Sequence, residues 1–461
     1  MGDSSKLKRK PRQRRCLRQL TSLVGISLAL YCLLFVYSPP QLDNGTTPWF
    51  PSRPSSIRLT PELLNNLSLR EDECKAAFLG LTKEIDDTVA KGPFTIKKSG
   101  HLGPVQGRIK DGQLYIIHAQ RRSDLSQDML NARTAALHQL HRALLTSPSP
   151  LPDTIFTLNT KDEPFGTALQ YSRAADPSMA SKDPSTRSLL IPHFAFWSWP
   201  LPFITSMRHA TTSITALEAS YSNQWHSKIP RAVWRGTSWY NSAHSPRLRQ
   251  NLLAATRNQP WADVQTLNWT SRGSGPDGAT AHGKTATNAL DVSEFCRYKY
   301  IIHTEGVAYS GRFPFLQMCK SVVLTPPILW MMHTTHFVRP VYSGVLLGRD
   351  KKGWKPSERA RRAWGMGVKP EEANMVFVQG DWSDLGETVK WLEEHGDVAE
   401  GIARRQRELV ADGGYHSPAA EACYWRAAIR GWASVARTEG DGWEELGVPF
   451  EAFSLTLDNE A

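Results

Sequence analysis

Apolar and polar residues along this chain follow two periods, one typical of strands and one typical of helices, in two successive blocks. In the first block, residues 113–118 and 154–158 are short apolar runs that predict strands, and residues 125–145 repeat apolar side chains as an amphipathic helix does. This alternation is typical of α/β proteins with parallel sheets, so we predict two α/β domains. The second block predicts strands over 232–234, 298–303 and 321–325 and helices over 247–256, 386–396, 397–411 and 417–437.

The N-terminus carries an apolar run over 20–37 that contains no charged residue. A helix of about 18–20 residues spans a bilayer core of about 30 Å, and basic residues before it place the N-terminus in the cytosol. A cleaved signal peptide is the alternative, but its apolar stretch is normally about 7–15 residues. We therefore expect a cytosolic tail over 1–19, a transmembrane signal anchor over 20–38 and a luminal stem over 39–72.

Length and charge narrow the class of protein. A chain of 461 residues suits two domains. Its net charge of +11 would fit a nucleic-acid-binding protein if it covered a folded surface, but eight Lys or Arg and one Asp fall within residues 1–19. Nucleic acid is therefore not an expected partner. Sixteen Trp fit either a carbohydrate site, where sugar rings stack on aromatic faces, or a large core.

Sequons and cysteines fit a luminal chain. Asn44, Asn66 and Asn268 each begin an Asn-X-Ser/Thr triplet and are candidate glycosylation sites. In an oxidising compartment, four cysteines allow two disulfides with three possible connectivities, and their spacing matches no zinc motif. The cysteines that follow the apolar run are Cys74, Cys296, Cys319 and Cys423.

Two polar clusters come directly after predicted strands, at the edge where parallel sheets bind ligands. In the first, Arg235, Gly236 and Thr237 precede Arg247, which begins a predicted helix. A glycine turn lets backbone N–H groups approach a phosphate, and Arg matches two phosphate oxygens. The alternative is a tight turn with surface arginines.

In the second cluster, a small-residue turn leads to Arg312 at the start of a short predicted helix. A cation there opposes the helix dipole, and a bound diphosphate would resolve the conflict. The alternative is an arginine that points into solvent. A metal-dependent transferase would need an Asp-X-Asp triplet, and the chain contains none.

The segment around Arg312 resembles the signature of glycosyltransferase family 90, the capsule-associated and protein O-glucosyltransferase family. The matching residues are Cys296, Tyr298, Lys299, Tyr300, Gly306, Ser310, Arg312, Phe313, Cys319 and Ser321. Upstream, residues 234–237 and 245–247 resemble the family's aromatic-Arg-Gly-Ser/Thr … Arg element. The resemblance covers about residues 75–430.

This resemblance implies a GT-B fold, with two facing Rossmann-like domains and a nucleotide-sugar cleft between them, preceded here by the transmembrane helix. The N-terminal domain, with the base and the acceptor, would span 73–215, the C-terminal UDP-sugar domain 216–412, and a C-terminal helix returning to the first domain 413–461. Arg247 and Arg312 would hold the diphosphate. The residues expected to bind the donor are Arg235, Gly236, Thr237, Arg247, Gly306, Val307, Ala308, Tyr309, Ser310 and Arg312.

The resemblance also assigns a base and a sugar pocket. Asp162, after a strand of the first domain, would deprotonate the acceptor hydroxyl. Glu163 is its nearest rival, and from the residues alone Asp162 could equally cap a turn. Phe196 and Trp197 would border the sugar or acceptor pocket, with core aromatics as the alternative. The sequence departs from the family after Trp197, which leaves the donor sugar open.

The family pattern pairs Cys296 with Cys319 and Cys74 with Cys423. This chain lacks the additional N-terminal cysteines found in the protein O-glucosyltransferases. Their absence favours a glycan or another acceptor over an epidermal-growth-factor-like protein. We therefore expect an inverting glycosyltransferase of the Golgi or endoplasmic reticulum membrane. It would transfer xylose or glucose from a UDP-sugar to a glycan or glycoprotein, and it would need no metal or other cofactor. The alternative is a catalytically inactive relative that binds carbohydrate.

Overall fold

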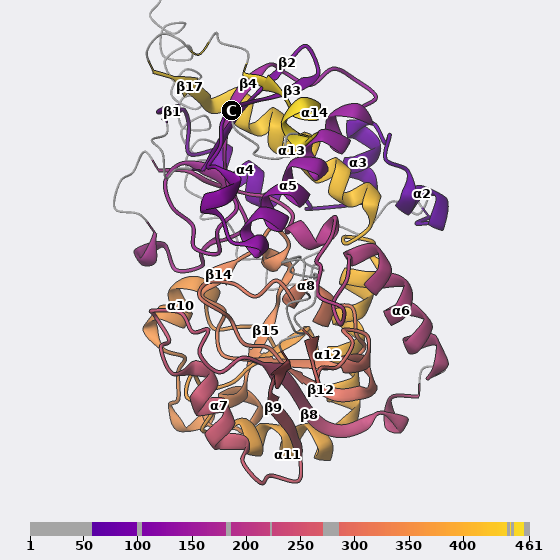
Figure 1. Ribbon diagram of the computed structural model, residues 1–461. Coiled ribbons are helices and arrows are strands. Elements are labelled where there is room, and N and C mark those ends of the chain that lie inside the picture. The colour runs from indigo at the N-terminus through magenta and orange to yellow at the C-terminus, as the bar shows by residue number, and fades with distance from the viewer. Residues whose placement is uncertain are drawn as a thin grey trace, which may run out of the picture. The chain divides into compact units, whose positions relative to one another are not determined.

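The computed structural model describes residues 58–98, 104–180, 186–221, 224–270, 285–439, 443 and 447–455. These residues fall within one compact unit over 53–461, in which two lobes are each built on a six-stranded sheet (Figure 1). The segments predicted as tail and membrane anchor, and the sequon at Asn44, lie outside the described residues.

The C-terminal lobe contains a wholly parallel sheet with the strand order β15-β16-β13-β12-β8-β9. Its central strands are buried runs, as expected when helices cover both faces of a sheet. The predicted strands over 298–303 and 321–325 are confirmed, and the strand predicted at 232–234 is longer than expected. The strands are β8 (Ile229–Gly236), β9 (Ala262–Thr266), β12 (Tyr298–Ile302), β13 (Val322–Thr325), β15 (Pro340–Tyr342) and β16 (Met375–Phe377).

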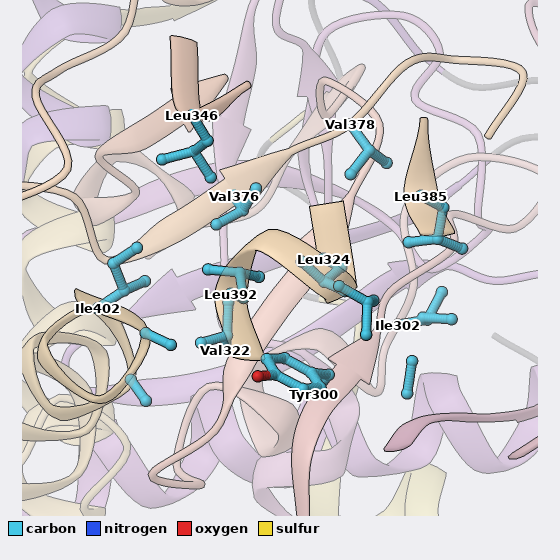
Figure 2. Packing of buried hydrophobic residues seen from close by; sticks show 14 of the residues in the cluster. Tyr300, Ile302, Val322, Leu324, Leu346, Val376, Val378, Leu385, Leu392 and Ile402 are labelled. Carbon is cyan, nitrogen blue, oxygen red and sulfur yellow. The ribbon is translucent and has the colours of Figure 1, made fainter. Parts of the chain in front are cut away.

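Helices pack on this sheet through a continuous apolar cluster. Figure 2 shows Val322 and Leu324 of β13 beside Leu392 and Ile402, which come from two helices near the C-terminus. Each such side chain contributes about 1.5–3 kcal/mol when fully buried. The predicted helices over 247–256, 386–396 and 397–411 are thus confirmed within a few residues. The helices of this lobe are α7 (Leu248–Thr256), α8 (Phe313–Leu316), α9 (Ser343–Leu346), α10 (Glu358–Trp364), α11 (Leu385–Glu394) and α12 (Gly396–Arg407).

The N-terminal lobe differs from the predicted Rossmann-like domain, because its sheet is mixed. The strand order is β18-β3-β2-β4-β5-β7, and the first three neighbouring pairs are antiparallel, whereas the pairs β4–β5 and β5–β7 are parallel. The strands are β2 (Val105–Lys110), β3 (Gln113–His118), β4 (Thr154–Asn159), β5 (Ala168–Gln170), β7 (Ser188–Leu190) and β18 (Val448–Pro449).

A two-residue turn explains the antiparallel start of this sheet. Asp111 and Gly112 join β2 to β3 with φ angles of 50° and 76°. Positive φ at both central residues is the geometry of a type I′ hairpin turn, for which Asp-Gly is a preferred pair. The prediction of a parallel sheet recognised the strand over 113–118 but not the hairpin before it.

The C-terminal helix returns to the N-terminal lobe. Figure 1 shows α13 beside α3, α4 and α5, and the predicted helices over 125–145 and 417–437 are confirmed as α5 and α13. Residues 58–72, expected as part of a stem, are folded onto this lobe, where Arg426 of α13 donates to the Leu69 carbonyl at 3.1 Å. The helices just named and the other helices not yet given have these bounds: α2 (Pro61–Asn65), α3 (Glu71–Ala77), α4 (Lys83–Val89), α5 (Gln127–Leu145), α6 (Met207–Ser220), α13 (Pro418–Val435) and α14 (Phe450–Leu455).

Three pairs of short strands complete the fold, and one of them joins the two lobes. β6 (Arg173–Ala174) pairs with β14 (Trp330–Met331) in antiparallel register. Close by, Arg362 of α10 donates to buried Asp176 at 2.8 Å, and this ion pair holds the pKa of the carboxyl well below its usual range. The other two pairs are β1 (Phe94–Ile96) with β17 (Ala436–Thr438), and β10 (Trp269–Thr270) with β11 (Thr285–Ala286).

The predicted fold class needs one further correction, because it included a membrane-spanning helix. Across the residues that the structure describes, every helix is too short or too polar to cross a bilayer. Residues 20–38, where the span was predicted, are outside that part of the chain.

Both disulfides inferred from the family resemblance are present. Cys74 is bonded to Cys423, and Cys296 is bonded to Cys319, with sequence separations of 349 and 23 residues. The first bond ties α3 to α13 and the second ties the residues before β12 to those before β13.

Removing the long-range disulfide is expected to cost more stability than removing the short one. In the chain-entropy account, a crosslink stabilises by restricting the unfolded chain, and the gain grows with loop length. The Cys74→Ala/Cys423→Ala variant should therefore lose about 2 kcal/mol more in free energy of unfolding than Cys296→Ala/Cys319→Ala. Guanidinium unfolding of both variants beside the parent measures the difference, and equal losses would contradict the entropic explanation.

Candidate active site

A cavity of about 300 Å³ is lined by side chains from both lobes. Most of the wall from the C-terminal lobe follows β8 and β12, at the carboxyl ends of those strands. The N-terminal lobe contributes Asp162, His193, Phe194 and Trp199. The two sequence clusters that we singled out after predicted strands, together with Asp162, therefore meet at one cavity.

Two arginines from the C-terminal lobe line this cavity. Arg249 of α7 donates to the carbonyl of Thr237 at 2.8 Å and to the carbonyl of Glu305 at 2.9 Å. Arg312 donates to the carbonyl of Arg235. Their hydrogen bonds within the described residues go to carbonyl or hydroxyl oxygens, and none goes to a carboxylate.

The charges of these arginines are poorly compensated by the protein. Burial, followed by the positive charge of Arg312, lowers the pKa of Arg249 to about 9. Part of Arg312 faces the cavity, but its guanidinium is surrounded by protein, which lowers its pKa to about 10. Two neighbouring cations without an anionic partner are unfavourable in a protein interior. The pair is therefore suited to binding an anion with several oxygens, such as a diphosphate.

The structure places Arg247, which was predicted to hold the diphosphate, outside this cavity. Arg247 is the N-cap residue of α7, its side chain is exposed, and it does not line the cavity. Arg249 lies on the buried face of α7 with Leu252 and Thr256, three and seven residues further on. That spacing is visible in the sequence and could have identified Arg249 as the inward-facing arginine.

The side chain of Arg235, which was predicted to bind the donor, also lies outside the cavity wall. Its guanidinium contacts the carboxylate of Asp263 at 2.9 Å and donates to the carbonyl of Asp263 at 2.8 Å. It does not line the cavity, whereas the following Gly236 and Thr237 do. Arg235 thus fixes the end of β8 against β9, and only its carbonyl reaches a residue of the cavity wall, Arg312.

The turn after β12 forms one side of the cavity. Gly306, Val307, Tyr309, Ser310 and Arg312 line it, whereas Ala308 is buried behind the wall. The N–H of Gly306 donates to the carbonyl of Tyr309 at 3.1 Å, and a Cβ at this glycine would be 3.1 Å from the same oxygen. A side chain at position 306 would therefore disturb the turn that presents Arg312.

Asp162 is presented by the loop that follows β4. Asn159, the buried last residue of β4, holds the loop by donating to the carbonyl of Glu163 at 3.0 Å and accepting from the N–H of Lys161 at 2.9 Å. The carboxyl of Asp162 is accessible from the cavity, but protein surrounds it. Desolvation and, secondarily, the charge of Glu163 raise the pKa of Asp162.

Other residues of the cavity wall were not singled out from the sequence. His193 is buried against Tyr309, with ring centres 5.5 Å apart, and burial lowers its pKa to about 3. A neutral imidazole and two indoles, Trp199 and Trp269, therefore add a largely uncharged surface to the cavity. The sequence signal for His193 and Trp199 was the aromatic stretch 194–200, which contains Trp199 and Phe196, with His193 directly before it.

A second hollow of about 230 Å³ begins beside the active-site cavity. Leu248 and Glu305 line this hollow, and the next residue after each, Arg249 and Gly306, lines the active-site cavity. The carboxylate of Glu305 accepts from the N–H groups of Leu329 and Trp330 at 2.9 and 2.8 Å. Burial nevertheless raises the pKa of Glu305 to about 8.

Phe196 and Trp197 do not line the active-site cavity. They line a different cavity, on the other side of the short η3 turn (Phe194–Phe196), because that turn directs Phe194 and Phe196 to different sides. Phe196 and Trp197, predicted to border the sugar or acceptor pocket, thus lie outside the active-site cavity, and an acceptor role for them stays a prediction.

Two further predictions concern metal and glycosylation sites. Among the described residues, the cluster with metal-ligand spacing consists of Glu218, Cys296 and Cys319. The two cysteines are bonded to each other and Glu218 pairs with Lys228 at 2.8 Å, so this donor set does not suit a metal.

Asn66 and Asn268 are exposed, and their glycosylation stays a prediction.

Comparison with known proteins identifies relatives of the chain. The chain is 23% identical over 285 residues to protein O-glucosyltransferase 1 of Rattus norvegicus, covering 60% of this chain and 61% of that protein. It is 22% identical over 309 residues to the Homo sapiens protein of the same name, covering 64% and 67%. It is 23% identical over 325 residues to the O-glucosyltransferase rumi homolog of Anopheles gambiae, covering 67% of each. The matched region thus spans about three fifths to two thirds of these relatives.

The sequence profile of glycosyl transferase family 90 matches residues 96–343, which is more than half of the chain. This range runs from the end of β1 to the start of α9, and it contains Asp162, Arg249 and Arg312. The chain is therefore a member of glycosyl transferase family 90.

Proposed function

We propose that this protein is an inverting, metal-independent glycosyltransferase that moves glucose or xylose from a UDP-sugar to an acceptor hydroxyl. The observation that carries the proposal is the convergence on one cavity of a carboxylate from one lobe and two arginines from the other, whose hydrogen bonds to described residues go to no carboxylate. These are the groups needed to stabilise a diphosphate leaving group and to activate an acceptor.

In the proposed reaction, Arg249 and Arg312 bind the diphosphate of the donor. As the bond between the anomeric carbon and the diphosphate breaks, negative charge grows on the leaving oxygen, and guanidinium groups aimed at that charge stabilise the transition state. Because their positive charges take the part that a divalent cation would otherwise play, we propose that transfer needs no metal.

Asp162 is the proposed general base. Its carboxylate takes the proton of the acceptor hydroxyl while the acceptor oxygen attacks the anomeric carbon from the face opposite the diphosphate, which inverts the configuration. UDP leaves with the electron pair of the broken bond. A raised pKa makes Asp162 a stronger base than an ordinary aspartate, provided that the pH keeps it ionised.

The hollow beside Glu305 is the proposed site of the nucleoside. It continues the active-site cavity from Arg249 and Gly306, so a UDP-sugar could lie with its diphosphate at the arginines and its uridine in the hollow. The Glu305 carboxyl lines this hollow and could bind ribose hydroxyls.

The names of the relatives point to glucose as the sugar and to a protein as the acceptor. Xylose differs from glucose by one hydroxymethyl group, so both remain in the proposal, with a glycan or glycoprotein as the acceptor. The two disulfides support an oxidising compartment of the secretory pathway, such as the endoplasmic reticulum or Golgi.

A panel of UDP-sugars tests this function. We expect the purified protein to release UDP from UDP-glucose or UDP-xylose at a rate that EDTA does not change, and to yield a product of inverted anomeric configuration by NMR. Loss of activity in EDTA would contradict the metal-independent mechanism. UDP binding without UDP release from any donor, in the presence of glycan and glycoprotein acceptors, would favour an inactive carbohydrate-binding relative.

A further inference from the structure

A cavity of about 300 Å³ lies on the other side of the turn that borders the active site. It is lined by the first turns of α6 and α13, by α5, by residues near the end of α2, and by Phe196 and Trp197. It shares no lining residue with the active-site cavity. The cavity is thus a separate feature built from five segments of the chain.

Two buried polar side chains line this cavity without satisfying their hydrogen-bonding capacity. Glu421 is 3% exposed; Arg142 donates to one oxygen of its carboxylate, and the other oxygen has no partner within the described residues. His416 is 4% exposed, and neither of its ring nitrogens has a partner there. Buried polar groups are normally paired, because leaving them bare is costly, so these atoms point to a ligand of the cavity.

The donor and acceptor pattern of the cavity fits hydroxyl groups. A neutral imidazole offers one donor and one acceptor, a carboxylate offers acceptors, and the guanidinium groups of Arg142 and Arg208 offer donors. Each hydroxyl of a sugar can both donate and accept, so one ring could satisfy all of them. Burial lowers the pKa of His416 to about 3, which keeps this imidazole uncharged at neutral pH.

The apolar part of the wall fits the carbon skeleton of the same ligand. Leu67, Phe196 and Met207 supply apolar surface, and Trp197 remains 37% exposed. The Trp197 indole is held in place by stacking on His138 at 5.0 Å and by the Arg142 guanidinium at 4.9 Å. The volume is at the small end of ligand sites, which run from about 300 to 1,000 Å³, and suits one sugar residue.

We propose that this cavity is a second saccharide-binding site that holds one neutral monosaccharide unit, separate from the site of the donor. The inference rests on the unpaired buried groups and the lining of the cavity, and it does not depend on the proposed transfer reaction. Because the residues from His193 to Trp199 are divided between the two cavities, a saccharide bound here contacts the same turn that borders the active site.

Methyl glycosides of glucose, galactose, mannose and xylose are the probes that test this site. We expect calorimetry and ligand-observed NMR on the full chain to show saturable, millimolar binding of at least one of them. Trp197→Ala and Glu421→Gln should each weaken that binding about tenfold or more, because each removes a side chain that lines the cavity.

Two matched controls separate binding from folding. Glu84 is also a buried carboxylate paired with an arginine, Arg173 at 2.6 Å, but it lines neither cavity. Glu84→Gln should lower the melting temperature as Glu421→Gln does and leave glycoside binding intact. Trp199→Ala changes the same type of residue on the active-site side of the turn and should also leave binding intact.

Three results would overturn the proposal: no saturable binding of any glycoside, binding that Trp197→Ala and Glu421→Gln leave unchanged, or saturable binding of inorganic phosphate in place of the glycosides. If Glu421→Gln fails to fold, Trp197→Ala carries the test alone, because Trp197 lies at the surface.

Discussion

Asp162→Asn is expected to reduce sugar transfer by about 10²- to 10⁴-fold while the affinity for UDP stays close to that of the parent. The asparagine keeps the size and shape of the side chain but cannot accept the proton of the acceptor hydroxyl. The loop should keep its conformation, because Asn159 holds it through the backbone of Lys161 and Glu163. Initial rates of transfer and calorimetric titration with UDP measure the two quantities separately.

Glu163→Gln is the matched control for this prediction. Glu163 is adjacent in sequence but does not line the cavity, so its substitution should change the rate little. If Glu163→Gln lost activity and Asp162→Asn kept it, Glu163 would be the base. A result in which neither variant lost activity would contradict a carboxylate base from this loop.

The pH dependence of the parent gives an independent test of the base. Desolvation, with the Glu163 charge, raises the pKa of Asp162 above the ordinary value of 3.8. The base must be ionised, so kcat/KM should fall as the pH drops through this raised pKa, and the acid limb should lie at a higher pH than an ordinary aspartate would give. An acid limb at or below the ordinary value would contradict the desolvation of the carboxyl.

The hydrophobic pattern predicted β8, β12, β13, α7, α11 and α12 of the C-terminal lobe because these elements are long enough to show their periods, whereas the three-residue strands β15 and β16 were not predicted. β12 and β13 end within a few residues of their predicted limits, and so does α13, which packs on the N-terminal lobe. The N-terminal sheet was harder to predict because β5 and β7 have three residues each, too few to show a period. Its antiparallel start depends on the turn at Asp111 and Gly112, and the prediction from sequence did not use this Asp-Gly signal.

The sequence predicted part of the candidate site. Motif resemblance identified Asp162 and Arg312, whose positions after β4 and β12 follow from the chain order. It could not decide which arginine of the segment 247–249 faces inward, because that depends on the rotation of α7 about its axis. It also placed Phe196 and Trp197 at the sugar or acceptor pocket, and these residues line the second cavity and not the active-site cavity.

The choice between Arg249 and Arg247 leads to the second large effect. Arg249→Ala and Arg312→Ala should each weaken UDP binding about 10- to 100-fold, because each removes charge-assisted hydrogen bonds worth about 1.5–3 kcal/mol. Arg247→Ala, two residues from Arg249 on the exposed side of α7, should leave UDP binding nearly unchanged. Calorimetry with UDP and uridine compares the variants, and uridine, which lacks the diphosphate, should bind all of them alike.

Arg249 also holds the carbonyls of Thr237 and Glu305, so its loss could loosen the cavity wall rather than remove a phosphate contact. Arg249→Lys and Arg312→Lys distinguish these explanations. A lysine keeps the charge but cannot make the forked contacts of a guanidinium, so binding should recover partly if the charge matters most. If uridine binding fell as far as UDP binding in Arg249→Ala, the arginine would be supporting the wall. If Arg247→Ala alone weakened UDP binding, the diphosphate would have to lie outside this cavity, and the proposed reaction would lose its leaving-group site.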